Sequence, residues 1–300
     1  MSAFASARIR ESVLDAPWYP HNAPDLRRMV EGYLAQAKSA AVPGKVVALV
    51  SPHAGYVYSG PTAAHAFAQV YGADYARVVL IGPLHRSIPG SELGAWMVPG
   101  EAAYRTPLGD VRVDRGFLAK LGERVPVTTV HGDREHSLEI ELPFLQVALG
   151  GSAPAMDSKL GLVPIMAGES IFEPGTYAQI EQMADALAEL SADGKTLLVA
   201  STDLTHLGDR TTDNHAGVVR IDRKLVELVR DFDVARLGAA LRTGQVQACG
   251  AVGLVTILRA AQRLGAQAAQ VLAYTTSSDV TGDKRPGTYC VGYLAAAAYI

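Results

Sequence analysis

Short runs of consecutive apolar residues recur along the chain, and several of them end in polar residues. These runs are rich in Val, Ile and Leu, and they occupy 47–53, 77–85, 159–168, 196–203 and 268–278. They lack the polar–apolar alternation of a strand with one exposed face, so we expect strands covered on both faces. The pattern therefore predicts a buried central sheet, mostly parallel or mixed.

Segments in which apolar residues recur at helical spacing lie between these runs. In 24–37, for example, Leu26, Met29, Val30 and Leu34 fall on one face of a helix. Further helices are expected at 62–70, 138–149, 177–190, 222–229 and 249–264. Strands that alternate with helices indicate an α/β layered domain in which helices flank the sheet.

The composition supports one large core and excludes several kinds of partner. Of the 300 residues 49% are hydrophobic, and the only candidate break, at 150–159, is short, so we expect a single domain over 1–300. The net charge is −3 without clustered Lys and Arg, which argues against nucleic-acid and membrane-surface binding. The chain shows no signal-peptide pattern and no apolar stretch near the ~20 residues of a membrane span.

The two cysteines are too few for a secreted disulfide framework, and a cytoplasmic location is expected. A single bridge between Cys249 and Cys290 is the alternative. Cys290 lies in the strand-like TYCVGYLAA and fits a core position. Cys249 precedes a glycine and an expected helix start, where the helix dipole lowers a thiol pKa; an inert buried thiol is the other interpretation.

Polar residues with catalytic or metal-binding chemistry follow three of the expected strands. His53 comes after the first run, His85 after the second, and Asp203 and His206 after the fourth. Ligands of open α/β sheets bind outside the carboxyl ends of the strands, so we expect these side chains to meet at one edge. A lone histidine there usually makes only a hydrogen bond, whereas several at equivalent strand ends favour a site.

The segment HGDREHSLE is dense in ionisable groups and precedes an expected helix. Ser137 is the candidate cap of that helix. Glu135 and His136 beside it are candidate catalytic residues; the alternative is that they form ion pairs with Arg134 or Arg105.

Two imidazoles and one anionic ligand make a suitable set for a divalent transition metal. A carboxylate in the third place is typical of iron, whereas a thiolate favours copper or zinc. The sequence alone therefore leaves the metal open among iron, copper and zinc.

An ordered set of motifs over nearly the whole chain resembles the Memo family, including the B component of the bacterial and archaeal AmmeMemoRadiSam system. The motifs are PHAGYVYSG (52–60), GPLH (82–85), YRTPLGD (104–110), EHSLEIELPF (135–144), STDLTH (201–206), ACG (248–250) and the closing GTYCVGYLA.

This resemblance implies a fold similar to the class III extradiol ring-cleavage dioxygenases. It implies metal ligation by His53, His85 and Cys249, and an acid/base role for His206 with Asp203 beside it. Iron or copper is the implied metal, with zinc as the alternative. A small molecule or peptide is the implied occupant of the pocket, and proteins of a radical SAM system are implied partners.

The chain departs from the animal Memo proteins at two positions. Arg86 stands where they carry a second histidine, and Glu141 stands where they carry a histidine. Glu141 is thus a candidate anionic ligand or a partner for Arg86. Three functions follow from the site: metal-dependent redox or oxygenase-like activity, a non-catalytic ligand- or peptide-binding module, and an extradiol dioxygenase in which Glu135, Glu139 or Glu141 completes an iron site.

Overall fold

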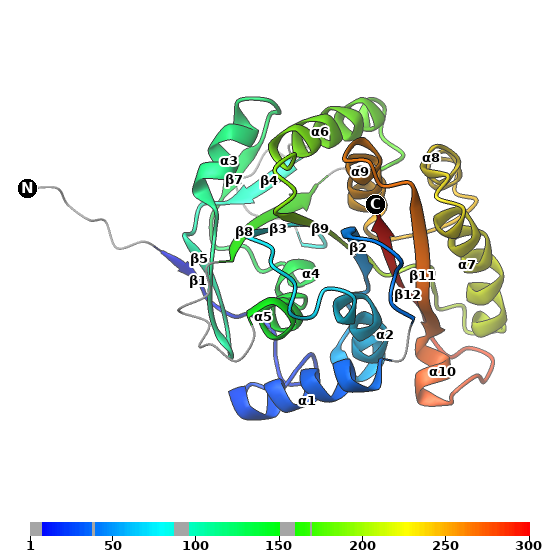
Figure 1. Cartoon of the computed structure of the whole chain (residues 1–300). Helices are drawn as coiled ribbons and strands as arrows, with labels where there is room; N and C mark the ends of the chain where they lie inside the picture. Colours follow the sequence, from blue (N-terminus) through cyan, green and yellow to red (C-terminus); the bar gives the residue numbers. More distant parts are fainter. Residues whose placement is uncertain (1–7, 38–39, 87–95, 151–159, 169) are drawn as a thin grey trace, which may run out of the picture.

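The computed structural model describes residues 8–37, 40–86, 96–150, 160–168 and 170–300 (Figure 1). A mixed sheet runs through the centre of the molecule, and in the described ranges its strand order is β10-β12-β2-β9-β3-β8-β4-β7, with β11 paired to β12. The strands are β2 (Val46–Ser51), β3 (Arg77–Pro83), β4 (Trp96–Pro99), β7 (Thr128–Val130), β8 (Gly161–Ala167), β9 (Thr196–Ser201), β10 (His206–Leu207), β11 (Ala268–Thr276) and β12 (Cys290–Tyr299).

The middle of this sheet is parallel and entirely buried. Strands β2, β9, β3 and β8 are parallel neighbours, and nearly every residue in them is inaccessible to solvent. The antiparallel pairs lie toward the edges, where β12 pairs with β2 and β4 pairs with β8. The sheet is therefore mixed, with a parallel centre whose continuous apolar runs are explained by cover on both faces.

Helices cover the two faces of the sheet. On one face, α1 (Ala23–Gln36), α2 (Tyr56–Ala68), α4 (His136–Glu139) and α5 (Leu142–Gly150) pack together against β2, β3 and β12. On the other face, α9 (Ala251–Arg263) packs on β9 and β3 and is covered by α6 (Thr176–Leu190), which contacts α3 (Arg115–Gly122) (Figure 1). The predicted α/β architecture, a central sheet flanked by helices, is confirmed.

Smaller elements complete the chain. A second sheet, in the order β1-β5-β6, joins β1 (Ile9–Arg10), β5 (Ala103–Thr106) and β6 (Gly109–Arg112). Helices α7 (Asn214–Arg230) and α10 (Ser277–Thr281) lie beside β11 and β12, and α8 (Val234–Arg242) packs on α7 and α9. None of the helices in the described ranges is long and apolar enough to cross a membrane.

The expected strands all form, but several helix boundaries differ from the expectation. The helix expected at 62–70 already begins at Tyr56, and the one expected at 222–229 is the second half of α7. The helix expected at 138–149 is interrupted after Glu139, which gives α4 and α5. The candidate break at 150–159 lies, except for Gly150, outside the described residues.

Candidate metal centre

The chain leaves β2, β9 and β3 at the same edge of the sheet, because the three strands are parallel neighbours. His53, Asp203 and His85 each follow two residues after the end of their strand, and His206 follows Asp203. All four side chains line one cavity of about 740 Å³. The predicted meeting of these residues at one edge is confirmed.

His136 joins the same cavity from α4, the short helix that lies over the end of β3. This close packing requires Gly82 in β3, because a Cβ there would come within 2.5 Å of Ser137 Oγ. Ser137 donates to the carbonyl of Pro83 at 2.8 Å, which fixes the start of α4 on β3. The helix thus places His136 beside the residues that follow the strands.

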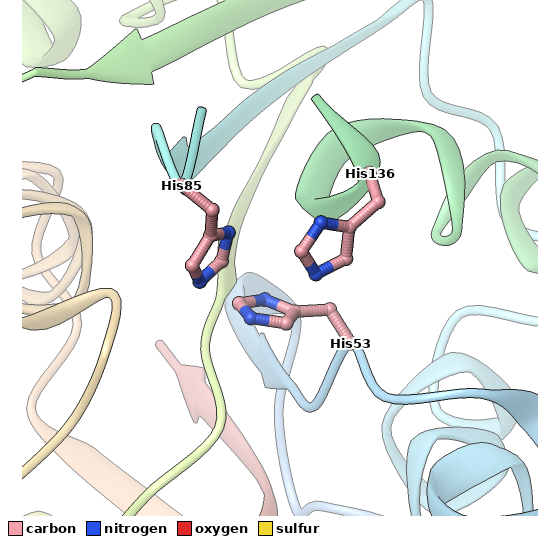
Figure 2. Close-up of side chains that lie close together, drawn as sticks. All are labelled: His53, His85 and His136. Atoms are coloured by element: carbon pink, nitrogen blue, oxygen red, sulfur yellow. The ribbon is translucent and has the colours of Figure 1, made fainter. Parts of the chain in front are cut away.

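The rings of His53, His85 and His136 face one another (Figure 2). One nitrogen from each imidazole lies within 4.8 Å of those of the other two, a spacing at which they can bind one metal ion. His85 and His136 are stacked at 4.5 Å between ring centroids, and His53 meets both rings edge-on. His53 is buried, whereas the side chain of His85 is 32% exposed.

Hydrogen bonds fix the protonation of these rings. His53 Nδ1 lies 2.8 Å from Ser201 Oγ, and that hydroxyl donates its only hydrogen to the carbonyl of Ser137, so His53 Nδ1 must donate. His85 Nδ1 donates to the carboxylate of Glu135 at 3.0 Å. With the protons on Nδ1, both Nε2 atoms keep a lone pair for a metal.

Glu135 supports one side of the cluster almost alone. Its carboxylate accepts from the main-chain nitrogens of His85, His136 and Ser137, and its Oε1 lies 3.2 Å from His136 Nδ1. Burial raises the pKa of this carboxyl, but the hydrogen bonds from His85 and Ser137 outweigh burial and bring it to about 2. Glu135 is therefore ionised, and it orients both rings from behind.

The imidazoles of His53 and His136 are uncharged at neutral pH. Burial lowers the pKa of His136 to about 4, although the Glu135 carboxylate opposes this shift. Burial and the neighbouring imidazoles also hold the pKa of His53 well below its usual range. Metal ligation needs unprotonated imidazoles, which these two residues provide at neutral pH.

Asp203 and His206 offer proton-transfer groups in the same cavity. Burial raises the pKa of Asp203 to about 7, while the bond that its carboxyl accepts from the His53 main-chain nitrogen, at 2.8 Å, partly offsets the shift. His206 Nδ1 donates to the carbonyl of Leu204 at 2.9 Å, which leaves Nε2 as the base. Burial lowers the pKa of His206 below its ordinary value.

Cys249 contacts the cluster at His53. Its sulfur lies 3.2 Å from His53 Nε2 and accepts from the main-chain nitrogen of Asp203 at 3.2 Å. It is not within 4.8 Å of all three imidazoles, and it lines two smaller clefts of about 380 and 320 Å³ instead of the main cavity. Both cysteines are free, so the alternative of a disulfide is wrong.

The expected low pKa of Cys249 is also wrong. Burial of the sulfur, with the Asp203 carboxyl nearby, raises the pKa of the thiol above its ordinary value. Helix α9 begins only at Ala251 with Gly250 as its cap, so the desolvation of the sulfur outweighs any effect of the helix dipole.

Other expectations for the EHSLE segment need correction. Glu135, and not Ser137, caps α4. Arg105 pairs with Glu11 and Asp110, so it is not the partner of Glu135.

The carboxylates proposed to complete an iron site do not line the cavity. Glu139 accepts hydrogen bonds from Ser12, Tyr19 and the main chain of Val13, and it forms a buried ion pair with Arg10. Glu141 is buried below the site, where it accepts from Ser51 Oγ at 2.8 Å. Glu135 instead contacts the Nδ1 atoms of His85 and His136.

Aromatic residues that the sequence patterns did not single out form much of the cavity wall. Trp18 packs on His136, with 4.6 Å between ring centroids. Tyr58, Tyr289 and Tyr293 line other parts of the wall, and Tyr289 is 59% exposed. Tyr58, Tyr289 and Tyr293 fall within quoted motifs, where they were not singled out. Trp18 lies outside these motifs, so nothing in the sequence patterns pointed to it.

Comparison with known proteins finds relatives over nearly the whole chain. The sequence model of the Memo-like protein family matches residues 10–297. The chain belongs to the Memo family. Among Memo-family relatives, MEMO1 family proteins of Nitrosopumilus maritimus and Thermotoga neapolitana are 30% and 32% identical to it. The first alignment covers 96% of this chain and 98% of the relative, and the second covers 96% and 99%.

Proposed function

We propose that this Memo-family protein binds a transition metal at His53 and His85, with Cys249 or His136 as third donor, and has a redox or oxygenase-like role. The main support for this proposal is that the three imidazoles lie within metal-binding distance of one another. Hydrogen bonds that orient ligating histidines through Nδ1 are typical of metal sites. Iron or copper suits this donor set, with zinc as the alternative. When bound, such an ion supplies an open coordination position and, for iron or copper, electron exchange.

The residues around the cluster suit proton transfer to and from a bound small molecule. His206 presents an unprotonated Nε2, and Asp203 has a pKa of about 7, near the value that favours acid/base work at neutral pH. Trp18 and the tyrosines shield the cavity and offer flat surfaces to a ligand. In this proposal Glu135 is a positioning residue, because it touches the ligands and not the cavity.

A non-catalytic ligand- or peptide-binding module is the second candidate. It is favoured by the exposure of Tyr58 and Tyr289, 42% and 59%, among the residues that line the cavity. Exposed aromatic residues beside a pocket are common in binding surfaces.

Metal analysis of protein purified without a His tag or added metal separates the two. We expect about one equivalent of iron or copper. His53→Ala and His85→Ala should each weaken metal binding by about 100-fold or more, because each removes a metal ligand and not merely a residue that orients one. His131→Ala is the matched control, because His131 pairs with Glu101 outside the cavity. Wild-type affinity in both variants would refute the site. Absence of metal under anaerobic handling would favour the binding module.

Ring cleavage tests the dioxygenase alternative. We expect little turnover of catechol by the anaerobically Fe(II)-loaded protein after oxygen is added, because none of the glutamates in the described ranges lines the cavity. Sustained formation of ring-opened product by the wild type, lost in His206→Ala, would instead establish the dioxygenase.

A further inference from the structure

We propose that Asp222, a buried residue of α7, is a positioning residue that fixes the tautomer of His206. Asp222 does not line the cavity, and it acts through the main chain of Thr205, the residue before His206. This inference rests on the acid/base role proposed for His206 and identifies what keeps that imidazole in place.

The Asp222 carboxyl joins α7 to two other segments of the chain. Its Oδ1 accepts from the main-chain nitrogen of Thr205 at 3.2 Å, and its Oδ2 accepts from the hydroxyl of Tyr274 in β11 at 3.0 Å. Burial raises the pKa of Asp222 to about 6, so the carboxyl is ionised at higher pH and both oxygens accept. A buried carboxylate without partners is costly, so Asp222 and its two donors hold one another in place.

Strand β12, which lies beside α7 and β11, leaves space for this carboxyl at Gly292 (Figure 1). A Cβ on Gly292 would collide with Asp222 Oδ2, whereas its φ is not in the left-handed region that favours glycine. Gly292 also accepts from the main-chain nitrogen of Leu204 at 2.8 Å and donates to the carbonyl of Thr205 at 3.0 Å. The strand thus pairs with the loop before His206, and Asp222 binds the main-chain donor of Thr205 that the strand does not.

The anchored main chain carries the hydrogen bond that sets the tautomer of His206. His206 Nδ1 donates to the carbonyl of Leu204 at 2.9 Å, which leaves Nε2 without a proton. This bond spans Thr205, so a rotation of the Thr205 main chain would break it. By holding the N–H of Thr205, Asp222 prevents that rotation and keeps Nε2 available as the base.

Nitrogen NMR of the histidine tautomers tests this role in metal-free protein at about pH 8, where imidazoles are neutral. Long-range proton–nitrogen correlations distinguish an Nδ1–H ring from an Nε2–H ring, and comparison with His206→Gln assigns the signals. His206 should be the Nδ1–H form in the wild type and a mixture of both forms in Asp222→Ala. Asp222→Asn should keep the Nδ1–H form, because its amide oxygen still accepts from Thr205 and its NH₂ can donate to the Tyr274 oxygen.

Two controls separate positioning from a general loss of stability. Tyr274→Phe removes the other hydrogen bond of the carboxyl but leaves the N–H of Thr205 paired, so the His206 tautomer should not change. Asp114→Ala removes a carboxylate that caps α3 and pairs with Arg77 outside the cavity. It should lower the melting temperature without changing the His206 tautomer.

The possible failures are distinguishable. If His206 in the wild type is not the Nδ1–H form, the proposed presentation of Nε2 fails, and this inference fails with it. If the wild type has this form and a folded Asp222→Ala keeps it, only the positioning role of Asp222 fails. A mixture that also appears in Asp114→Ala would assign the change to a loosened fold and overturn the role. If circular dichroism shows that Asp222→Ala does not fold, Asp222→Leu, which has the same branching without acceptor oxygens, is judged by the same outcomes.

Discussion

Two parts of the site are held in different ways. In the first part, the carboxylate of Glu135 contacts the rings of His85 and His136. In the second part, the side chains of Asp203 and Cys249 accept hydrogen bonds from main-chain nitrogens. Glu135 is ionised and receives five polar contacts, so one side chain orients two imidazoles. Asp203 instead binds the main chain of His53, and its own main chain bonds with Cys249 in both directions. The first part therefore depends on one charge, and the second on the path of the backbone.

The packing of the second part shows why the backbone can do this. Gly250 lies against the end of β9, where a Cβ would come within 2.6 Å of the carbonyl of Ser201. Gly250 also donates to Thr202 Oγ1 at 2.9 Å. Cys249 thus reaches His53 through the close approach of two chain segments. Burial raises the pKa of Asp203, Cys249 and Glu135 alike. Only for Glu135 do the hydrogen bonds outweigh burial and lower the pKa.

The largest effect is expected from the charge of the first part. Glu135→Gln should lower the affinity for a divalent metal by about 10- to 100-fold, because the amide orients the rings without the negative charge. Equilibrium dialysis against Co(II) or Zn(II) measures this. Asp233→Asn is the control, since Asp233 also caps a helix but lies outside the cavity. An unchanged affinity in Glu135→Gln would show that the charge behind the rings is unimportant.

The next effect concerns the thiol of the second part. In metal-free protein at about pH 8, Cys249 should react with iodoacetamide at least about tenfold more slowly than a free thiol, because its raised pKa keeps it protonated. The Cys290→Ala background leaves one thiol to follow by mass spectrometry. If the alkylation rate were high and already increased at pH values below the ordinary thiol pKa, the sulfur would be a thiolate in metal-free protein.

A smaller, opposite pH dependence should distinguish the two parts in metal-free protein. The lowered pKa of Glu135 gives stability that is present above about pH 4.5 and lost as pH falls toward about 2. The raised pKa of Asp203 gives stability that is fully present below about pH 4 and lost as pH rises through about 7. Urea denaturation across this range should therefore show a shallower loss of stability below about pH 4.5 in Glu135→Gln, and a shallower loss between about pH 4 and 7 in Asp203→Asn. Profiles parallel to wild type would contradict both assignments.

The smallest effect is optical. Trp18 packs on His136, whereas Trp96, the other tryptophan, is buried in β4 away from the cavity. A paramagnetic metal bound at the imidazoles should quench the fluorescence of Trp18. We expect Trp18→Phe to remove most metal-dependent quenching and to change metal affinity by less than about threefold, because an aromatic ring is retained. Quenching that survives in Trp18→Phe but disappears in Trp96→Phe would place the metal elsewhere.

The apolar runs of the sequence predict the buried centre of the sheet and the edge at which the site lies. Unbroken apolar runs can be satisfied only by strands covered on both faces, and parallel strands release the chain at one edge. His53, His85, Asp203 and His206 were therefore predictable from their places after strands. Helix boundaries were less so. Pro143 has no N–H to bond to the carbonyl of Glu139, four residues earlier, and the helix is interrupted between them.

The tertiary structure was needed to learn which donors lie together and which of them are charged. It put His136 with His53 and His85, and it placed Cys249 against His53 but outside that group. It also raised the pKa of Cys249, where a helix start had suggested the opposite. Sequence position carries the type of a side chain and its element. Distances between donors and the loss of solvent around each depend on how separate segments pack, and these two quantities set metal geometry and pKa.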